Sequence, residues 1–215
     1  MRTMLRGVAV AVVAVCALAG AAHAQVFYSF PGAKPVSDAS PSLGLVAGFG
    51  DNVVRLGGFG RFNLSSKADL GLEAMFNNVK GEGTTDDTGY GGGGVDGKYQ
   101  FYSAHPDMQI DIAANAGVGV LARSSYYNIH VPFGALASHD FTLKDGRLIV
   151  PYAGLYFIYD FVHIDVPAPA DNSDSKFDTE LRIGASAEIV KKGSLFAALH
   201  AGNGTMFFIG FNAGL

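Results

Sequence analysis

The chain of 215 residues has a formal net charge of −4, is 49% hydrophobic and only 16% charged, and contains one cysteine. The acidic balance argues against nucleic acid as a partner, and the single cysteine excludes a disulfide within the chain. So many apolar residues with so few charges are unusual for a secreted soluble protein.

Residues 1–24 have the organisation of a secretory signal peptide. Arg2 and Arg6 precede an apolar stretch from Gly7 to Gly20, and the small-x-small pattern Ala22-His23-Ala24 follows. This order is typical of an export signal, and the apolar stretch is shorter than the roughly 20 residues of a membrane-spanning helix. We therefore expect cleavage after Ala24, which leaves a net charge of about −6 and no cysteine.

Residues 25–41 hold three prolines and little pattern, so we expect an irregular leader there. From Ser42 onward apolar residues recur at every second position, which predicts strands. The clearest example places Phe177, Leu181 and Ile183 on one face and Glu180 and Arg182 on the other. The predicted strands are 42–50, 53–64, 68–77, 92–103, 107–121, 126–141, 147–162, 176–190, 194–202 and 205–215.

In five of these strands, 53–64, 68–77, 92–103, 107–121 and 176–190, one face carries no charge over about ten residues, the length that a tilted strand needs to cross a bilayer. A sheet in lipid must close, because open edges leave backbone groups without hydrogen bonds. The sequence therefore predicts an all-β fold, a closed antiparallel up-and-down transmembrane β-barrel of about ten strands over residues 42–215. Eight strands is the alternative if the first two are misread.

The connections fall into two groups. Long ones are predicted at 81–91 and 163–175, and an even number of strands between them places both on the same side. Short ones at 65–67, 104–106, 142–146 and 191–193 lie on the other side, as in bacterial outer-membrane barrels. Aromatic residues near the strand ends on the long-loop side suggest an interfacial belt: Tyr90, Tyr126, Tyr127, Tyr159 and Phe161.

These features resemble the small bacterial outer-membrane β-barrel proteins, the OmpA/OmpX-like and porin-like group. The resemblance rests on the signal peptide, on strands such as GVDGKYQFY and VPYAGLYFIYDF, and on the final TMFFIGFNAGL. It implies a place in the Gram-negative envelope, with outer-membrane lipid and lipopolysaccharide around the barrel. It also implies that the barrel-assembly machinery recognises the last strand, although Leu215 stands where an aromatic residue is usual. The sequence does not indicate an oligomeric state.

This resemblance implies an integral outer-membrane protein with a structural, surface-interaction or narrow-channel (porin-like) role. Two further functions stay open. One is that of an outer-membrane enzyme that modifies lipid or peptide, and the other is that of a soluble periplasmic ligand-binding β-barrel.

Charged residues on the inward face of a narrow barrel are expected to pair with one another. Around the turn near Ser66, for example, Arg61 should lie diagonal to both Asp69 and Glu73. The predicted ionic network of the lumen, which is structural, comprises Arg55, Arg61, Asp69, Glu73, Asp96, Lys98, Asp111, Glu180, Arg182 and Glu188.

No pattern in the sequence predicts a catalytic, cofactor or metal site. Residues 89–94 match G-x-G-x-x-G, but no helix follows to hold a phosphate, so a flexible rim is expected. Ser186, Glu188 and His200 are the residue types of a hydrolase. However, His200 should lie level with Gly184, too far from Ser186 for a triad.

Two groups of oxygen-bearing side chains, 171–175 and Asp86-Asp87, are expected to be solvated loops. The predicted orientation of the side chains can be tested with a pair of substitutions. Leu72→Arg on the lipid face should destabilise the barrel by roughly 2–4 kcal/mol, whereas Gly71→Ser in the lumen should be mild.

Overall fold

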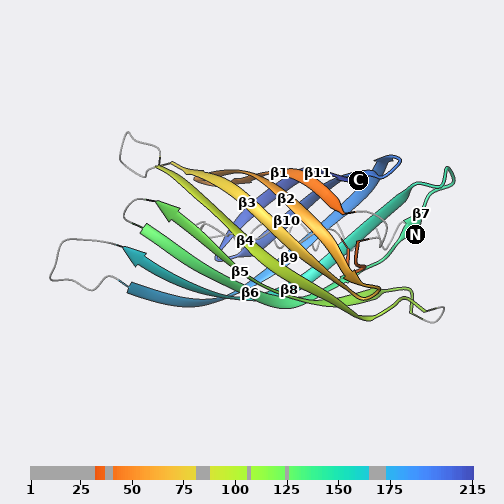
Figure 1. The fold of residues 1–215 in the computed structure, drawn as a ribbon, viewed down its shortest axis with the longest axis horizontal. Coiled ribbons are helices and arrows are strands. Elements are labelled where there is room, and N and C mark those ends of the chain that lie inside the picture. The colour runs from red at the N-terminus through yellow and green to blue at the C-terminus, as the bar shows by residue number, and fades with distance from the viewer. Residues whose placement is uncertain (1–31, 37–40, 81–87, 106–107, 124–125, 165–172) are drawn as a thin grey trace, which may run out of the picture.

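The computed structural model describes residues 32–36, 41–80, 88–105, 108–123, 126–164 and 173–215. These residues form one antiparallel sheet (Figure 1). No helix capable of crossing a bilayer occurs among them. The strands are β1 (Ser42–Gly50), β2 (Val53–Ser65), β3 (Ala68–Val79), β4 (Thr88–Tyr102), β5 (Asp111–Arg123), β6 (Tyr126–Ser138), β7 (Phe141–Thr142), β8 (Leu148–Ile164), β9 (Ser173–Val190), β10 (Gly193–Gly202) and β11 (Gly204–Gly214).

The sheet closes into a barrel of ten long strands. Each long strand pairs with its neighbour in the chain, β6 pairs with β8, and all nine residues of β1 pair with β11 from Ser42↔Gly214 to Gly50↔Met206. The two-residue β7 adds only to the end of β8. The predicted closed antiparallel up-and-down barrel of ten strands is confirmed, and the eight-stranded alternative is wrong.

Strand boundaries follow the sequence pattern with four main differences. The strand expected over 107–121 begins only at Asp111, so the connection expected at 104–106 runs from 103 to 110. The glycine run 89–94, expected as a flexible rim, belongs to β4 and pairs along β3 and β5. β9 begins at Ser173, inside the predicted loop 163–175. The strand expected over 126–141 is interrupted after Ser138, where the opposite residue of β8 is Pro151, which has no N–H to complete the ladder.

One end of the barrel holds the two-residue β2–β3 and β9–β10 turns, together with connection 103–110 and the β7–β8 hairpin; the other holds connections 80–87 and 165–172, together with the β1–β2, β5–β6 and β10–β11 turns of one or two residues (Figure 1). The two predicted long connections do lie at the same end, but the predicted division into a rim of short connections and a rim of longer ones is wrong, because each end holds connections of both kinds. We call the first end the short-turn rim and the second the long-loop rim. Residues 41 and 215 lie at the short-turn rim, where the backbone N–H of Leu215 donates to the carbonyl of Pro41.

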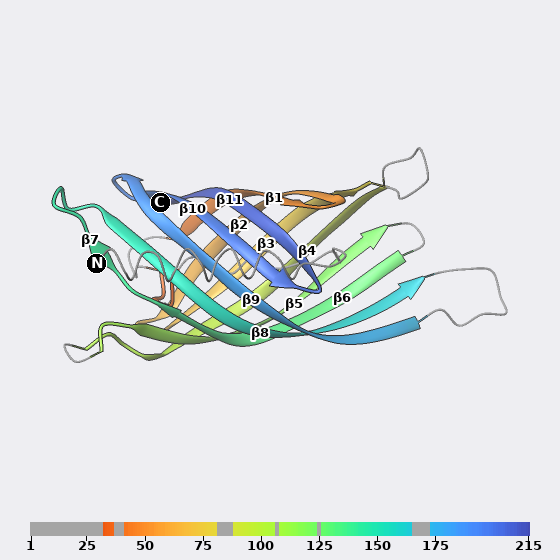
Figure 2. The same cartoon turned by 180° about the vertical axis from the view of Figure 1, so that it is seen from behind.

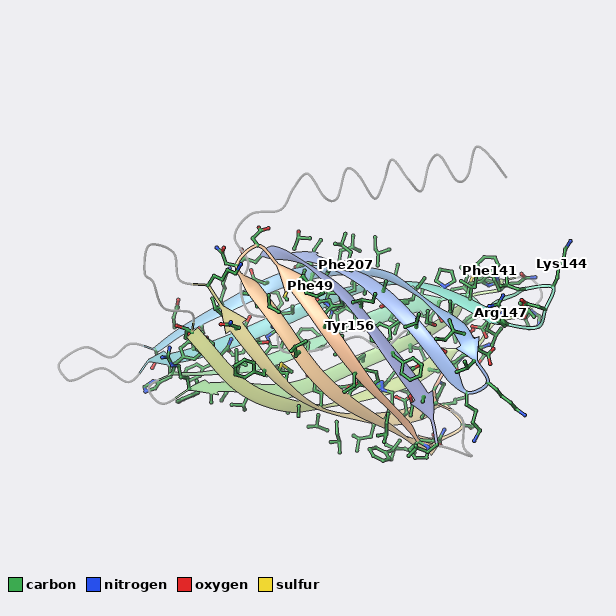
Figure 3. The ribbon with its side chains drawn as sticks, turned by 90° about the horizontal axis from the view of Figure 1, so that it is seen from above. Phe49, Phe141, Lys144, Arg147, Tyr156 and Phe207 are labelled. Carbon is green, nitrogen blue, oxygen red and sulfur yellow. The ribbon has the colours of Figure 1, made fainter. Side chains whose placement is uncertain are left out.

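Apolar side chains cover the outside of the barrel and charged ones lie inside. Leu45 is 70% exposed and Leu72 48%, whereas Arg55 is fully buried. The outer face continues across the closing seam, where Phe49 and Phe207 form a cross-strand pair (Figure 3). In β8, which is apolar on both faces, Leu155 and Phe157 point outward and Tyr156 inward. This is the reverse of a soluble barrel, which keeps its apolar face inside.

Three of the five residues expected in the aromatic belt lie on the outer face. Tyr127 and Tyr159 are exposed on the outer face, and Phe161 lies 6.2 Å from Tyr127 between ring centroids. Tyr90 and Tyr126, however, point into the barrel and contact each other with their ring centroids 5.2 Å apart. Their positions near the rim were predicted correctly. However, they occupy the alternate positions of β4 and β6 whose side chains point into the barrel.

Aromatic rings inside the barrel pack against glycines of the neighbouring strand. Phe59 pairs with Gly44, and a Cβ added to that glycine would lie 2.2 Å from the ring. Phe196 covers Gly210 in the same way, and Gly48–Phe208 and Gly184–Tyr152 repeat the arrangement. Glycine on the wall thus leaves room for a ring to lie against the sheet, an arrangement that also shields the glycine backbone.

Leu72→Arg tests the facing assignment. Leu72 lies midway along β3 on the outer face, so an arginine there should reduce the free energy of unfolding by about 2–4 kcal/mol in a bilayer. Leu64, at the short-turn end of β2, is the matched control, since the same substitution near an interface costs only about 0–1 kcal/mol. Urea titration in lipid vesicles measures both, and equal losses would contradict the assignment.

Candidate functional site

An ionic cluster fills the interior near the short-turn rim. Arg61 lies between two carboxylates: its Nη1 is 3.1 Å from Asp69 Oδ1, and its Nη2 donates to Asp96. Lys98 Nζ lies 3.4 Å from the other oxygen of Asp69, and Asn115 donates to Asp96 at 2.7 Å. All four charged residues are buried. Charges buried in this way require partners and hydrogen bonds, and the cluster supplies both.

Residues 32–36, which we call the mouth segment, cross the barrel directly below this cluster. Lys98 Nζ donates to the carbonyl oxygens of Gly32 and Lys34, at 3.0 and 2.7 Å. The backbone N–H of Val36 donates to Asp69 at 3.0 Å, and that of Ala33 donates to Ser138 Oγ at 2.7 Å. Ala33 is fully buried. The mouth segment is thus bound to β3, β4 and β6 at the same time.

Lys34 ties the mouth segment to the rim through its side chain. Its Nζ lies 2.6 Å from Asp140 and 3.5 Å from Asp111. Burial lowers the pKa of Lys34, but its hydrogen bonds and attraction to these carboxylates outweigh burial and raise the pKa above its usual value. Lys34 therefore stays charged at neutral pH.

Two cavities remain beside the mouth segment. One of about 490 Å³ lies toward β2, β4 and β5, and the other, of about 200 Å³, lies toward Ser138 and Asn212. Lys34, Pro35 and Val36 line both of them. The mouth segment therefore divides the short-turn end of the interior.

A second layer of side chains fills the middle of the barrel. The Arg182 side chain donates to Glu180 and lies 3.9 Å from the ring centre of Tyr156, a cation–π distance. His200 Nδ1 is 3.4 Å from Glu180, and the ring of His200 packs on Phe208 at 4.4 Å. Each of these side chains is at most 1% exposed; Figure 3 shows Tyr156 inside the barrel wall.

Arg55 extends this layer toward the long-loop rim. Its Nε donates to Asn77 at 2.6 Å, and its guanidinium lies 5.9 Å from the Phe208 ring. Beyond it, His130 Nδ1 is 2.6 Å from Asp160, which also accepts a hydrogen bond from Asn128. The interior is therefore packed with side chains over most of its length.

The structure gathers most of the predicted ionic network, with some changes. Arg61 pairs with Asp69 as expected, and its second partner is Asp96. Glu73 is buried and acts electrostatically on Arg182, and Asp111 accepts from Gln100 at 2.8 Å. Glu188 does not lie in the cluster: it is half-buried at the rim, where it accepts a 3.4 Å hydrogen bond from the backbone N–H of Leu148.

The surroundings of Gly71 argue against the mild effect expected for Gly71→Ser. A Cβ there would lie 2.2 Å from Asp96 Oδ1 and 2.9 Å from Arg61 Nη2. Any side chain would displace the buried ion pair, so we expect a substantial loss of stability. Gly97, on the outer face of β4, has nothing within 4 Å of an added Cβ and serves as the control.

The hydrolase pattern does not form a triad. His200 pairs with Arg182, whereas the sequence predicts Gly184 opposite it. Four residues of strand, about 13 Å, therefore separate its level from Ser186, and Glu188 is farther still. Within the described ranges, no group of three or more His, Cys, Asp or Glu side chains could hold a metal ion. Asp86-Asp87 and residues 171–172 lie outside those ranges, and residues 173–175 belong to β9.

Several functional residues carried no readable signal in the sequence. The mouth segment has no strand pattern, and its partners are ordinary polar residues of different strands. The inward aromatics Tyr152 and Tyr156 lie in a strand that is apolar on both faces. The one signal that could have found the interior rings was the abundance of glycine, since these rings pack on glycines.

Comparison with known proteins supports the architecture. No protein-family model matches the chain, and no curated protein sequence is significantly similar to it. The β domain of the Bordetella autotransporter BrkA superposes with a TM-score of 0.53 at 14% identity, over 82% of this chain and 99% of that one. KdgM porin gives 0.41 at 12% identity, over 81% and 99%. An outer membrane channel from Pseudomonas putida F1 gives 0.38 at 10%, over 87% and 100%.

Of these three, only the BrkA domain exceeds a TM-score of 0.5, and identities this low show a shared fold and not a shared activity. The closed ten-stranded barrel, its apolar exterior and the BrkA comparison agree. The chain therefore resembles, in fold, the β-barrel proteins of bacterial outer membranes.

Proposed function

We propose that this protein is an integral outer-membrane barrel with a closed interior, and that its role is structural or surface-interacting and not enzymatic. The observation that carries the proposal is the filled lumen. The middle layer around Arg182 and Tyr156 is almost inaccessible to water, and the mouth segment crosses the short-turn end. This arrangement favours a closed barrel over the narrow-channel role.

A soluble ligand-binding barrel and a lipid- or peptide-modifying enzyme have weaker support. A soluble barrel would expose polar side chains, whereas here Leu45 and Leu72 are among many large apolar residues exposed on the outside. An enzyme of this kind needs a nucleophile beside a base. His130 has an orienting partner in Asp160, but its cross-strand neighbours, Gly119 and Asp160, supply neither a hydroxyl nor a thiol.

The proposed surroundings follow from the same orientation. The outer faces of the strands would contact outer-membrane lipid, and the long-loop rim would lie among lipopolysaccharide. The outward alternation Phe207, Ile209 and Phe211 of β11 would present the last strand to the barrel-assembly machinery.

Planar-bilayer recording tests the closed interior. Purified, folded protein should give no discrete conductance steps, because no open water path crosses the middle layer. The same sample must first show the slower or faster gel migration that boiling abolishes in a folded barrel, so that a silent recording reports a closed barrel and not an unfolded protein. Regular single-channel steps from wild-type protein would overturn the proposal in favour of the channel role.

A further inference from the structure

A patch of basic and apolar side chains stands out on one side of the short-turn rim. The hairpin between β7 and β8 extends beyond the barrel, and the β9–β10 turn lies at the same end (Figures 1 and 2). The β8–β9 ladder joins the two regions, and the backbone N–H of Leu148 donates to Glu188 between them. We call six exposed basic and apolar residues of these two turns the rim patch: Phe141, Leu143, Lys144, Arg147, Lys191 and Lys192.

The apolar half of the rim patch continues the outer face of the barrel. Phe141 is 53% exposed and pairs with Ile149, which is on the outer face of β8. Leu143 follows two residues later and is 40% exposed. Figure 3 shows Phe141, Lys144 and Arg147 together on the projecting hairpin. Phe141 and Leu143 are therefore placed to enter the same lipid layer as the strands.

The charged half has more cations than anions. Lys144 and Arg147 lie on one turn and Lys191 and Lys192 on the next. Two carboxylates oppose them: Asp145, which pairs with Arg147 at 2.6 Å, and Glu188, which also attracts Arg147. Lys192 Nζ lies 3.1 Å from the backbone oxygen of Leu215. The turns thus present an excess of positive charge immediately beyond an apolar surface.

Lys192 occupies a backbone position that would suit glycine better. Its φ of 66° is the only positive φ at a non-glycine residue in the described chain, and a lysine there is strained. Strain kept in a two-residue turn, with a glycine only one position later, indicates that the side chain has a use. A cation at the rim is what lysine adds and glycine lacks.

We propose that the rim patch binds anionic phospholipid headgroups of the periplasmic leaflet. The proposal rests on the proposed function, which places the short-turn rim at that leaflet. The lipid phosphate lies between the cations of the two turns, and the acyl chain packs along Phe141 and Leu143. Cations next to an apolar, membrane-level surface are the arrangement that attracts anionic lipid.

Thermal unfolding in mixed micelles tests the rim patch. Folded protein in a neutral detergent is heated with added phosphatidylglycerol or with phosphatidylcholine, and the folded fraction is read from the gel shift. Wild-type protein should unfold about 5 °C higher with phosphatidylglycerol than with phosphatidylcholine, as expected for a ligand that binds only the folded state. The triple variant Lys144→Gln, Arg147→Gln, Lys191→Gln should lose most of this difference.

A control variant with the same change in net charge separates binding at the rim patch from general attraction of anionic lipid to a basic protein. Lys67→Gln, Lys80→Gln, Arg123→Gln removes three exposed cations from other turns and strand ends, and this variant should keep the phosphatidylglycerol effect. If both triple variants lose it equally, or if neither does, the rim patch is not the site. A stabilisation produced by poly-glutamate and not by phosphatidylglycerol would overturn the lipid proposal in favour of an acidic protein partner.

The Lys192→Gly variant separates the effect of losing the lysine charge on lipid binding from any effect on the stability of the barrel. In phosphatidylcholine the variant should be at least as stable as wild type, because glycine relieves the positive φ, yet it should gain less from phosphatidylglycerol. If the protein shows no heat-dependent gel shift at all, the membrane-barrel function fails. If the shift is present but the two lipids act alike, only the rim-patch inference fails.

Discussion

Arg61→Met should destabilise the folded barrel by about 3–5 kcal/mol, because it leaves two carboxylates buried without their shared cation. Arg61 is 2% exposed and contacts both Asp69 and Asp96. Lys98 remains as an ion-pair partner of Asp69 and attracts Asp96 more weakly, so Asp96 loses its principal charge partner. The chain has no tryptophan, so the measurement is the urea midpoint of the heat-dependent gel shift in lipid vesicles.

The matched control removes the charges together. Replacing Asp69 and Asp96 by Asn in the Arg61→Met background should recover most of the loss, since an apolar or neutral replacement of a whole buried ion cluster is often tolerated. A single Arg61→Met variant within about 1 kcal/mol of wild type would show that the cluster contributes little and that water reaches these carboxylates.

The outward face of the barrel could be predicted because lipid imposes a simple rule on it. One uncharged face of alternating residues specified both the strand and its orientation, and β1, β3 and β10 appear almost at their predicted bounds. The rule does not apply to a strand that is apolar on both faces, and there the predicted register was weaker. β8 is apolar on both faces, so its register could be established only by its pairing with β6 and β9.

The interior was predictable in composition but not in detail. Parity placed Arg61 and Asp69 on one face, and the turn at Ser66 brought them together as expected. Contacts between strands distant in sequence depend on the shear of the whole barrel. The Arg61–Asp96 contact over Gly71, which joins β2 to β4, was missed for this reason. His200 faces Arg182 and not Gly184 for a local reason: the β9–β10 pairing shifts its register between Gly193 and Ser194.

The mouth segment could not be predicted, because residues 25–41 have no periodicity and were treated as an irregular leader. Four residues of the described part, Gly32, Ala33, Lys34 and Val36, nevertheless make specific hydrogen bonds inside the barrel. Such a segment is held by its partners and not by its own conformational preference. Its binding should therefore depend on a small number of side chains.

Lys98→Met should release the mouth segment while leaving the barrel folded. Lys98 donates to the carbonyls of Gly32 and Lys34, and hydrogen bonds from a charged group contribute about 1.5–3 kcal/mol each. Losing both should increase the open population at least about 150-fold. With the signal peptide and Cys16 removed, Ala33→Cys places the only thiol of the chain at a fully buried position.

A water-soluble maleimide then reports release of the segment by its rate of reaction with Cys at position 33. Protection is expected with Lys98 present and rapid labelling in the Lys98→Met background, with an unchanged gel shift in both. Lys67→Met, which removes an exposed cation from the nearby β2–β3 turn, should leave the thiol protected. Equal labelling with and without Lys98 would mean that the mouth segment is not held by this lysine. In that case the mid-barrel layer around Arg182 and Tyr156 would alone have to account for a closed interior.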